Sequence, residues 1–168
     1  MYIIRNEHRD DIPGVRDVNT AAFETSTEAN LVDALRQQVN GLISLVAIED
    51  DAVVGHILFS PVTLSSHPDL PIMGLAPMAV MPARQRCGIG SALVRAGLEA
   101  CRRSGFVAVV VLGHAAYYPR FGFAPASRFG MASEYDVPDE VFMGVELQTG
   151  ALDGKSGTIA YHPAFADA

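Results

Sequence analysis

The sequence is poor in the residues from which disulfide frameworks and metal sites are built. Only two of its 168 residues are cysteines, Cys87 and Cys101, which is too few for a disulfide framework. The five histidines stand far apart, without the spacing of metal ligands, at positions 8, 56, 67, 114 and 162. We therefore expect no metal site and a fold that needs no covalent staple.

The chain also lacks a hydrophobic run that could cross a membrane. Its longest aliphatic run, residues 107–112, is far shorter than the roughly 20 residues that a bilayer requires. Near the N-terminus, Arg5, Glu7 and His8 interrupt the sequence before a signal-peptide core could form. We expect a cytoplasmic protein with no membrane partner.

Basic residues are scarce relative to acidic ones, 12 against 19, and the formal net charge is −7. A nucleic-acid partner would need a basic face that neutralises phosphates, so this balance argues against one. An acidic protein suits a cationic substrate such as an amine, although the same acidity also serves solubility.

Composition and periodicity predict one domain over residues 1–168, without repeats or linkers. Hydrophobic residues make up 49% of the chain and charged residues 18%, which is typical of a globular fold. Asp10 or Asp11 is expected to cap a first helix that runs to Ala22. Further helices are expected at 28–38, 88–104 and 114–120, and strands at 2–5, 44–49, 53–64, 71–80, 106–112, 141–147 and 157–161. The order predicts a mixed α/β fold, in which an antiparallel meander feeds a β-α-β crossover.

Residues 80–94, VMPARQRCGIGSALV, carry the clearest functional signal. A strand ends at Val80, because Pro82 has no N–H with which to continue a ladder, and an amphipathic helix follows. The first N–H groups of a helix lack internal partners and its dipole adds partial positive charge, so this turn suits a phosphate. Gly88 and Gly90 carry no Cβ, so a ligand can approach the backbone closely.

The spacing excludes two common nucleotide-binding loops. A Walker A loop needs a lysine after its glycines, and none follows Gly88 in this chain. The dinucleotide fingerprint needs a third glycine where Leu93 stands, and an acidic residue about 20 positions on, where the chain reads AVVVLG. Arg84, Gln85 and Arg86 add side-chain donors and positive charge to the turn.

The stretch resembles the acetyl-coenzyme A signature of the GNAT superfamily of N-acetyltransferases, Gln/Arg-x-x-Gly-x-Gly/Ala after an apolar strand. The resemblance implies the acyl-CoA N-acyltransferase fold, with a mostly antiparallel central sheet, and acetyl-CoA as co-substrate. It implies that the pyrophosphate binds backbone N–H groups of residues 86–91 and that the pantetheine arm bonds to the backbone of the preceding strand. The cofactor-binding residues expected on this basis are Met78, Ala79, Val80, Gln85, Arg86, Cys87, Gly88, Ile89, Gly90 and Ser91.

Two positions depart from the usual pattern of the superfamily. Position 86 is Arg where many members have Gly, and position 87 is Cys where a small or polar residue is usual. Because backbone groups do most of the binding in such a loop, we expect both substitutions to be tolerated.

A second block, GHAAYYPRFGF at 113–123, is similar to one bacterial subgroup of small predicted acetyltransferases. Tyr118 stands four residues before the Gly122-Phe123 pair, as the catalytic tyrosine of the superfamily does. The resemblance implies that Tyr118 is the general acid that protonates the leaving thiolate. A phenol with a pKa of about 10 keeps its proton at neutral pH and can serve in this way. The adjacent Tyr117 is the structural alternative.

The base that deprotonates the amine is left open. An alkylammonium with a pKa of about 10.4 must lose a proton before it attacks, so a carboxylate, often through water, would assist. Glu24 and Glu28 lie between the first two helices, which face the acceptor in the superfamily, and Glu28 is the base candidate. Glu24, the acidic residues of 134–140 and His114 are alternatives, and every one of these also suits a surface or capping role.

We predict an acetyl-CoA-dependent N-acetyltransferase that moves an acetyl group to a primary amine by direct transfer in a ternary complex. The acceptor is a small-molecule amine or an amino group of a protein or peptide, and a homodimer is left open. The alternative is a non-catalytic CoA- or acyl-CoA-binding sensor or partner module of the same fold. Tyr118, retained together with an intact cofactor turn, favours the enzyme.

Overall fold

The computed structural model describes residues 1–167, which divide into two compact units. The first unit contains Met1–Ser60, Ala76–Gly97 and the C-terminal segment from Pro163. The second contains Pro61–Leu75 and Leu98–His162. This division does not test the expectation of one domain over residues 1–168, which stays a prediction.

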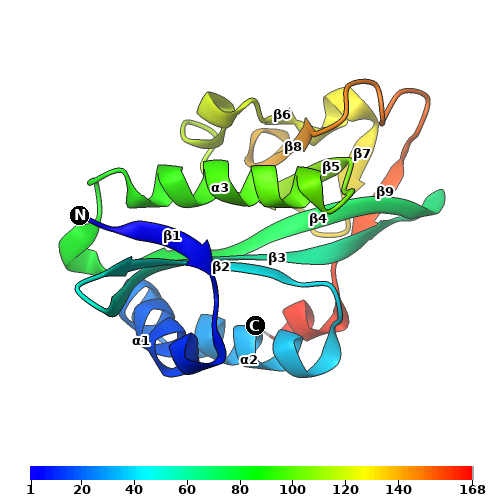
Figure 1. Cartoon of the computed structure of the whole chain (residues 1–168). Helices are drawn as coiled ribbons and strands as arrows, with labels where there is room; N and C mark the ends of the chain where they lie inside the picture. Colours follow the sequence, from blue (N-terminus) through cyan, green and yellow to red (C-terminus); the bar gives the residue numbers. More distant parts are fainter. Residues whose placement is uncertain (168) are drawn as a thin grey trace. The chain divides into compact units, whose positions relative to one another are not determined.

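The sheet of the first unit is an antiparallel meander (Figure 1). Strand β1 (Ile3–Asn6) pairs with β2 (Ile43–Glu49), and β2 pairs with β3 (Ala52–Leu64). Asp50 and Asp51, the residues between β2 and β3, have φ angles of 51° and 62°. Two consecutive residues with positive φ make the turn that matches the twist of a tight hairpin, so the predicted hairpin at this position is confirmed.

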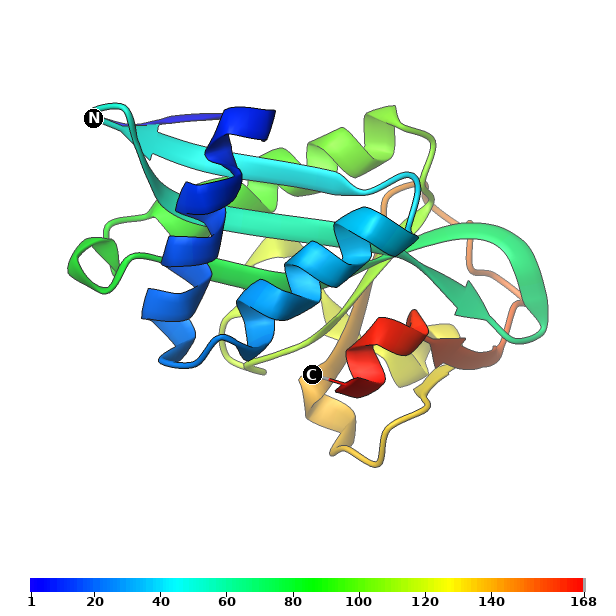
Figure 2. The same cartoon turned by 90° about the horizontal axis from the view of Figure 1, so that it is seen from below.

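Helices α1 (Ile12–Phe23) and α2 (Thr27–Gln38) cover one face of this meander (Figure 2). Apolar residues of both helices meet strand residues in one core cluster of buried side chains: Val15, Leu31, Val32, Leu35, Val46 and Leu58. Asp11 precedes α1, but its carboxylate makes no capping bond to that helix, contrary to expectation. It instead accepts hydrogen bonds from Arg5 and from the backbone N–H of His8, both at 2.6 Å.

The first half of helix α3 (Ile89–Arg103) packs on β3 within the first unit. A Cβ at Gly97 would lie 2.2 Å from the ring of Phe59, so only glycine allows this close approach. Helix α3 begins at Ile89, beyond the end of β4 (His67–Val80), and this is within one residue of the predicted start.

The second unit contains the parallel strand pair of the predicted β-α-β crossover. Strand β4 runs parallel to β5 (Ala108–Leu112), with Ile72 opposite Ala108. Strand β8 (Phe142–Glu146) pairs antiparallel with β5 and with the short β6 (Ala124–Pro125). Strand β9 (Gly157–Ala160) pairs antiparallel with the end of β3 and parallel with β7 (Met131–Ser133). The mixed, mostly antiparallel sheet is as predicted.

Two predicted segments need correction, and two short strands were not predicted. The expected helix at 114–120 is a single 3-10 turn, Tyr118–Phe121. Pro119 disfavours a helix before it, and Gly122, with φ 95°, ends the turn. Strand β4 begins at His67 rather than at 71, and the short β6 and β7 were not expected. Among residues 1–167, no helix is both long and apolar enough to span a membrane.

Candidate active site

The segment between β4 and α3 forms an exposed turn built on two left-handed residues. Arg86 has φ 64° and Gly88 has φ 86°, and the chain is exposed from Gln85 to Gly88. The first helical hydrogen bond runs from the Ala92 N–H to the Gly88 carbonyl at 3.0 Å. The N–H groups of Ile89 and Gly90 precede that bond and have no carbonyl partner inside the helix. They remain available to an anion.

The Cβ position of Gly88, a glycine of this turn, faces open space. A Cβ built there would meet no atom within 4 Å, so the glycine is not required by packing within the chain. Its positive φ explains part of the preference for glycine at position 88. The free space at the Cβ position leaves room for a ligand to lie against the backbone. The turn therefore fits a diphosphate at the start of α3.

Two of the three expected side-chain donors have partners inside the protein. Gln85 donates from Nε2 to the Val80 carbonyl at 3.1 Å, which links the turn to the end of β4. Arg84 forms an ion pair with Glu49 of β2, with 2.7 Å between the guanidinium nitrogen and Oε2. Arg86 is exposed, and within residues 1–167 it makes neither an ion pair nor a hydrogen bond.

The N-terminal strands supply contacts to the turn that the sequence did not reveal. The Tyr2 hydroxyl donates to the Gly88 carbonyl at 3.5 Å, and the Met81 N–H donates to the Val54 carbonyl at 2.9 Å. Glu49, the partner of Arg84, also belongs to these strands. No local pattern in the sequence predicts these contacts. Tyr2 lies 86 positions from its partner Gly88, and Glu49 lies 35 positions from its partner Arg84.

The three predicted cofactor-binding residues of the strand, Met78, Ala79 and Val80, are the last three of β4 and lie in the same unit as the turn. Ala79 is buried, whereas Met78 and Val80 are half-buried. Ser91 and Cys87 also fall in this unit, Ser91 in the first turn of α3 and Cys87 exposed in the loop. The structure thus brings all ten predicted cofactor-binding residues into one continuous strand-turn-helix segment.

Tyr118 lies in the second unit and is only 7% exposed. Its ring covers Gly113, where a Cβ would come within 2.3 Å of it, and meets the Phe123 ring edge-on at 5.6 Å between centroids. Burial raises the pKa of Tyr118 to about 12. The phenol is therefore held in its protonated form, as a proton donor must be.

Tyr117, the structural alternative, is less buried than its neighbour. The Arg120 guanidinium lies 4.6 Å from the centre of the Tyr117 ring, and Arg120 Nε donates to the Tyr117 carbonyl at 2.9 Å. The two rings meet edge to face at 5.1 Å. These contacts give Tyr117 a structural role that does not require it to take part in catalysis.

The base candidates are divided between the two units. Glu28, in the first turn of α2, is half-buried and accepts a hydrogen bond from Thr25 Oγ1 at 3.4 Å. Glu24 is exposed and ends α1 in a left-handed conformation. His114 and the acidic residues of 134–140 belong to the second unit and are exposed. Glu28 is thus the least solvated carboxylate among these candidates.

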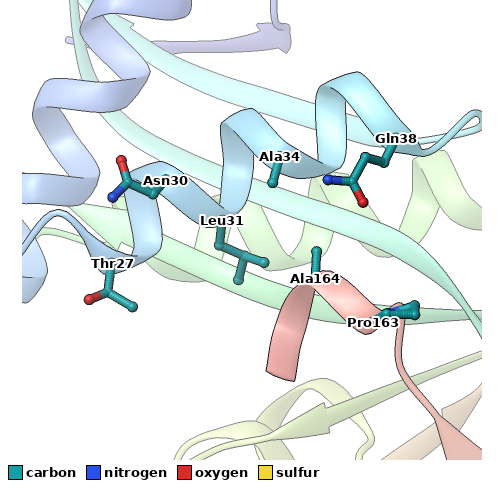
Figure 3. Close-up of a pocket in the computed structure, with 7 residues that line it drawn as sticks. All are labelled: Thr27, Asn30, Leu31, Ala34, Gln38, Pro163 and Ala164. Carbon is teal, nitrogen blue, oxygen red and sulfur yellow. The ribbon is translucent and has the colours of Figure 1, made fainter. Parts of the chain in front are cut away.

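Two pockets within the first unit have similar volumes but different linings. One, of about 340 Å³, lies between α2 and the C-terminal 3-10 helix (Figure 3) and has an uncharged lining: Thr27, Asn30, Leu31, Ala34, Gln38, Pro163 and Ala164. The other, of about 360 Å³, is acidic and is lined by Asp10, Asp11, Gly14, Asp17, Asp51, Ala52, Val53 and Met81. Within residues 1–167, no group of three or more His, Cys, Asp or Glu side chains could hold a metal ion.

Comparison with known proteins identifies the family. Residues 6–123 match the acetyltransferase (GNAT) family. This chain belongs to the GNAT family. A curated relative, the uncharacterized N-acetyltransferase YjhQ of Escherichia coli K12, is 43% identical over 136 residues, which cover 79% of this chain and 75% of YjhQ. The uncharacterized N-acetyltransferase YhbS of the same strain is 35% identical over 97% of this chain and 98% of its own.

Solved structures of GNAT proteins carry the cofactor. YhbS from Escherichia coli in complex with CoA matches with a TM-score of 0.92 and 34% identity, over 98% of this chain and 92% of that one. A GNAT family acetyltransferase from Brucella melitensis in complex with acetyl-CoA matches with a TM-score of 0.81 and 37% identity, over 98% of both chains. The predictions of a GNAT fold, of N-acetyltransferase activity and of acetyl-CoA as co-substrate are confirmed.

Proposed function

We propose that this GNAT acetyltransferase moves an acetyl group from acetyl-CoA to a primary amine by direct transfer in a ternary complex. The observation that carries the proposal is the open turn around Gly88, after which the N–H groups of Ile89 and Gly90 precede the first hydrogen bond of α3. An anion at this place is stabilised by those N–H groups and by the helix dipole. In our proposal the CoA pyrophosphate lies there, and the pantetheine arm follows the backbone of residues 78–80.

Bound acetyl-CoA supplies an activated acetyl group on a thioester, with a thiolate as the leaving group. Tyr118 holds its proton at the phenol oxygen, because burial raises its pKa to about 12, and in the proposal it gives that proton to the departing sulfur. Glu28 is proposed to take the proton that the acceptor ammonium must lose. A base at this point is useful because unassisted deprotonation at pH 7 costs about 4 to 5 kcal/mol.

The acceptor is proposed to be cationic in solution, as a small amine or as the amino group of a peptide or protein. A net charge of −7 attracts such a molecule, and the aspartate-lined pocket of the first unit shows acidic side chains gathered at one place. A cytoplasmic location and a single domain remain predictions from the sequence.

The test of the cofactor site is Gly88→Asp, with Gly41→Asp as a matched control. Both glycines have positive φ, 86° and 82°, and a Cβ at either would meet no atom within 4 Å. Both variants therefore suffer similar backbone strain, but only Gly88→Asp places a carboxylate beside the proposed phosphates. We expect calorimetry to show loss of CoA binding in Gly88→Asp alone. Unchanged CoA affinity in a folded Gly88→Asp protein would overturn the assignment.

The test of the reaction is acetyl transfer to a panel of amines and peptides by the wild-type protein. Release of free CoA that depends on the amine, with the acetylated product identified by mass spectrometry, is the expected result. Binding of acetyl-CoA without turnover on any acceptor would favour the non-catalytic sensor instead.

A further inference from the structure

The turn between β4 and α3 contains two arginines, Arg84 and Arg86, which differ in the partners that residues 1–167 give them. Arg84 is paired with Glu49, and Gln85 is bonded to the Val80 carbonyl. The exposed Arg86 makes no such contact with any residue from 1 to 167. Its guanidinium is therefore available to a ligand that reaches this turn.

The backbone conformation at Arg86 would be served better by glycine. Its φ of 64° is left-handed, a conformation in which a Cβ is crowded against the backbone. The side chain is exposed, and no hydrogen bond or ion pair with residues 1–167 compensates for this strain. An exposed arginine in this strained backbone conformation points to a role in binding rather than in folding.

We propose that Arg86 binds the 3′-phosphate of CoA and makes the enzyme prefer CoA to 3′-dephospho-CoA. The inference rests on the proposed function, in which the pyrophosphate lies on the backbone of this turn. The N–H groups at the start of α3 serve the pyrophosphate, and the 3′-phosphate is the remaining anionic group of CoA. A guanidinium offers paired donors that fit the oxygens of a phosphate. In a protein with a net charge of −7, one free cation at this turn also offsets repulsion of the anionic cofactor.

The experiment compares CoA and 3′-dephospho-CoA binding by calorimetry in the wild type, Arg86→Gly and Arg103→Gln. Arg103, in the last turn of α3, is exposed and serves as a control for the loss of one positive charge. The wild type should bind CoA about tenfold more tightly than 3′-dephospho-CoA, which is the size of one charge-assisted contact. Arg86→Gly should abolish this preference by weakening CoA binding, and Arg103→Gln should keep it.

A thermal melt of the same ligand-free proteins provides a second, independent readout. Glycine accepts a left-handed φ without strain, so Arg86→Gly should melt at the same temperature as the wild type or higher while binding CoA less tightly. Equal weakening of both ligands in Arg86→Gly, or a wild type that binds both equally, would overturn the 3′-phosphate assignment and leave the proposed cofactor site standing. A wild type that binds neither ligand would overturn the proposed function itself.

Discussion

Lowering the pH from 7 to 4 is expected to destabilise the protein through one buried side chain, His56. The residue lies in β3, is fully buried and has a partner at each ring nitrogen. Asn19 Nδ2 lies 3.1 Å from Nδ1, and Ser44 Oγ lies 2.9 Å from Nε2. The same Asn19 amide donates to the Val15 carbonyl at 2.9 Å, which assigns its NH₂ group and makes Nδ1 an acceptor. His56 is therefore a neutral ring that donates from Nε2 to Ser44.

The size of the effect follows from the pKa of His56. Burial, with a smaller contribution from the Arg36 charge, lowers this pKa from 6.5 to about 3. As the pH falls below 6.5, the unfolded chain takes up a proton at His56 that the folded protein refuses until about pH 3. The free energy of unfolding should decrease by about 1.4 kcal/mol per pH unit in this window, or about 3 kcal/mol between pH 7 and pH 4. Such a loss is a large part of the roughly 5 to 15 kcal/mol that stabilises a typical domain.

Urea denaturation at a series of pH values between about 4 and 8 measures this slope. We expect His56→Gln to be less stable than the wild type at neutral pH but to lose less stability on acidification. His114→Gln, at an exposed position, should retain the wild-type slope. The Asp11 carboxyl, whose pKa is lowered chiefly by its hydrogen bond from Arg5, adds acid sensitivity below its ordinary value of 3.8 in all three proteins.

A His56→Gln variant with the full wild-type slope would refute the assignment of this acid sensitivity to His56. If the variant does not fold, the imidazole signals in the NMR spectrum of the wild type test the assignment instead. They should show a neutral His56 ring at pH 4, and protonation of that ring near pH 6 in the folded protein would contradict the reasoning.

Two further predictions concern the reaction. Tyr118→Phe should slow acetyl transfer by about 10² to 10⁴ while CoA affinity, measured by calorimetry, stays nearly constant. Tyr117→Phe is the control, and a larger loss there than at Tyr118 would show that the general acid has been assigned to the wrong tyrosine. The profile of kcat/KM against pH should rise toward the alkaline side, because the acceptor must lose a proton before it attacks. Glu28→Gln should shift this limb to higher pH and Glu24→Gln should not, whereas a flat profile between about pH 6 and pH 9 with rate-limiting chemistry would remove deprotonation from the mechanism.

The cofactor turn was predictable because all its parts are neighbours in the sequence. Pro82 ends one ladder, the glycines open the turn, and helical periodicity begins at Ile89, so strand, turn and helix follow from one short segment. The hairpin at Asp50 and Asp51 was predictable for the same reason. By contrast, residues 114–120 include helix-compatible residues, but too few of them lie between Gly113 and Pro119 to form a helix. Only a 3-10 turn forms there, Tyr118–Phe121.

Contacts between distant segments were out of reach of local patterns. Nothing near Arg84 predicts that Glu49 pairs with it, and nothing near Gly88 predicts the hydroxyl of Tyr2 at its carbonyl. The buried network around His56 is of the same kind, because Asn19 lies 37 positions away in the sequence. Residues of these types are common on surfaces, so only the folded structure distinguishes them from solvated side chains.

The same distinction explains why the cofactor of this enzyme is better defined than its acceptor. A phosphate site at a helix start is made of backbone N–H groups, which every residue except proline supplies, so the glycines alone reveal it. An acceptor site is made of side chains, and the candidate carboxylates come from separate parts of the chain: Glu28 from α2 and the acidic residues of 134–140 from the second unit. Selection can change those side chains without disturbing the turn at Gly88. Proteins that share this turn can therefore share acetyl-CoA and differ in the amine that they acetylate.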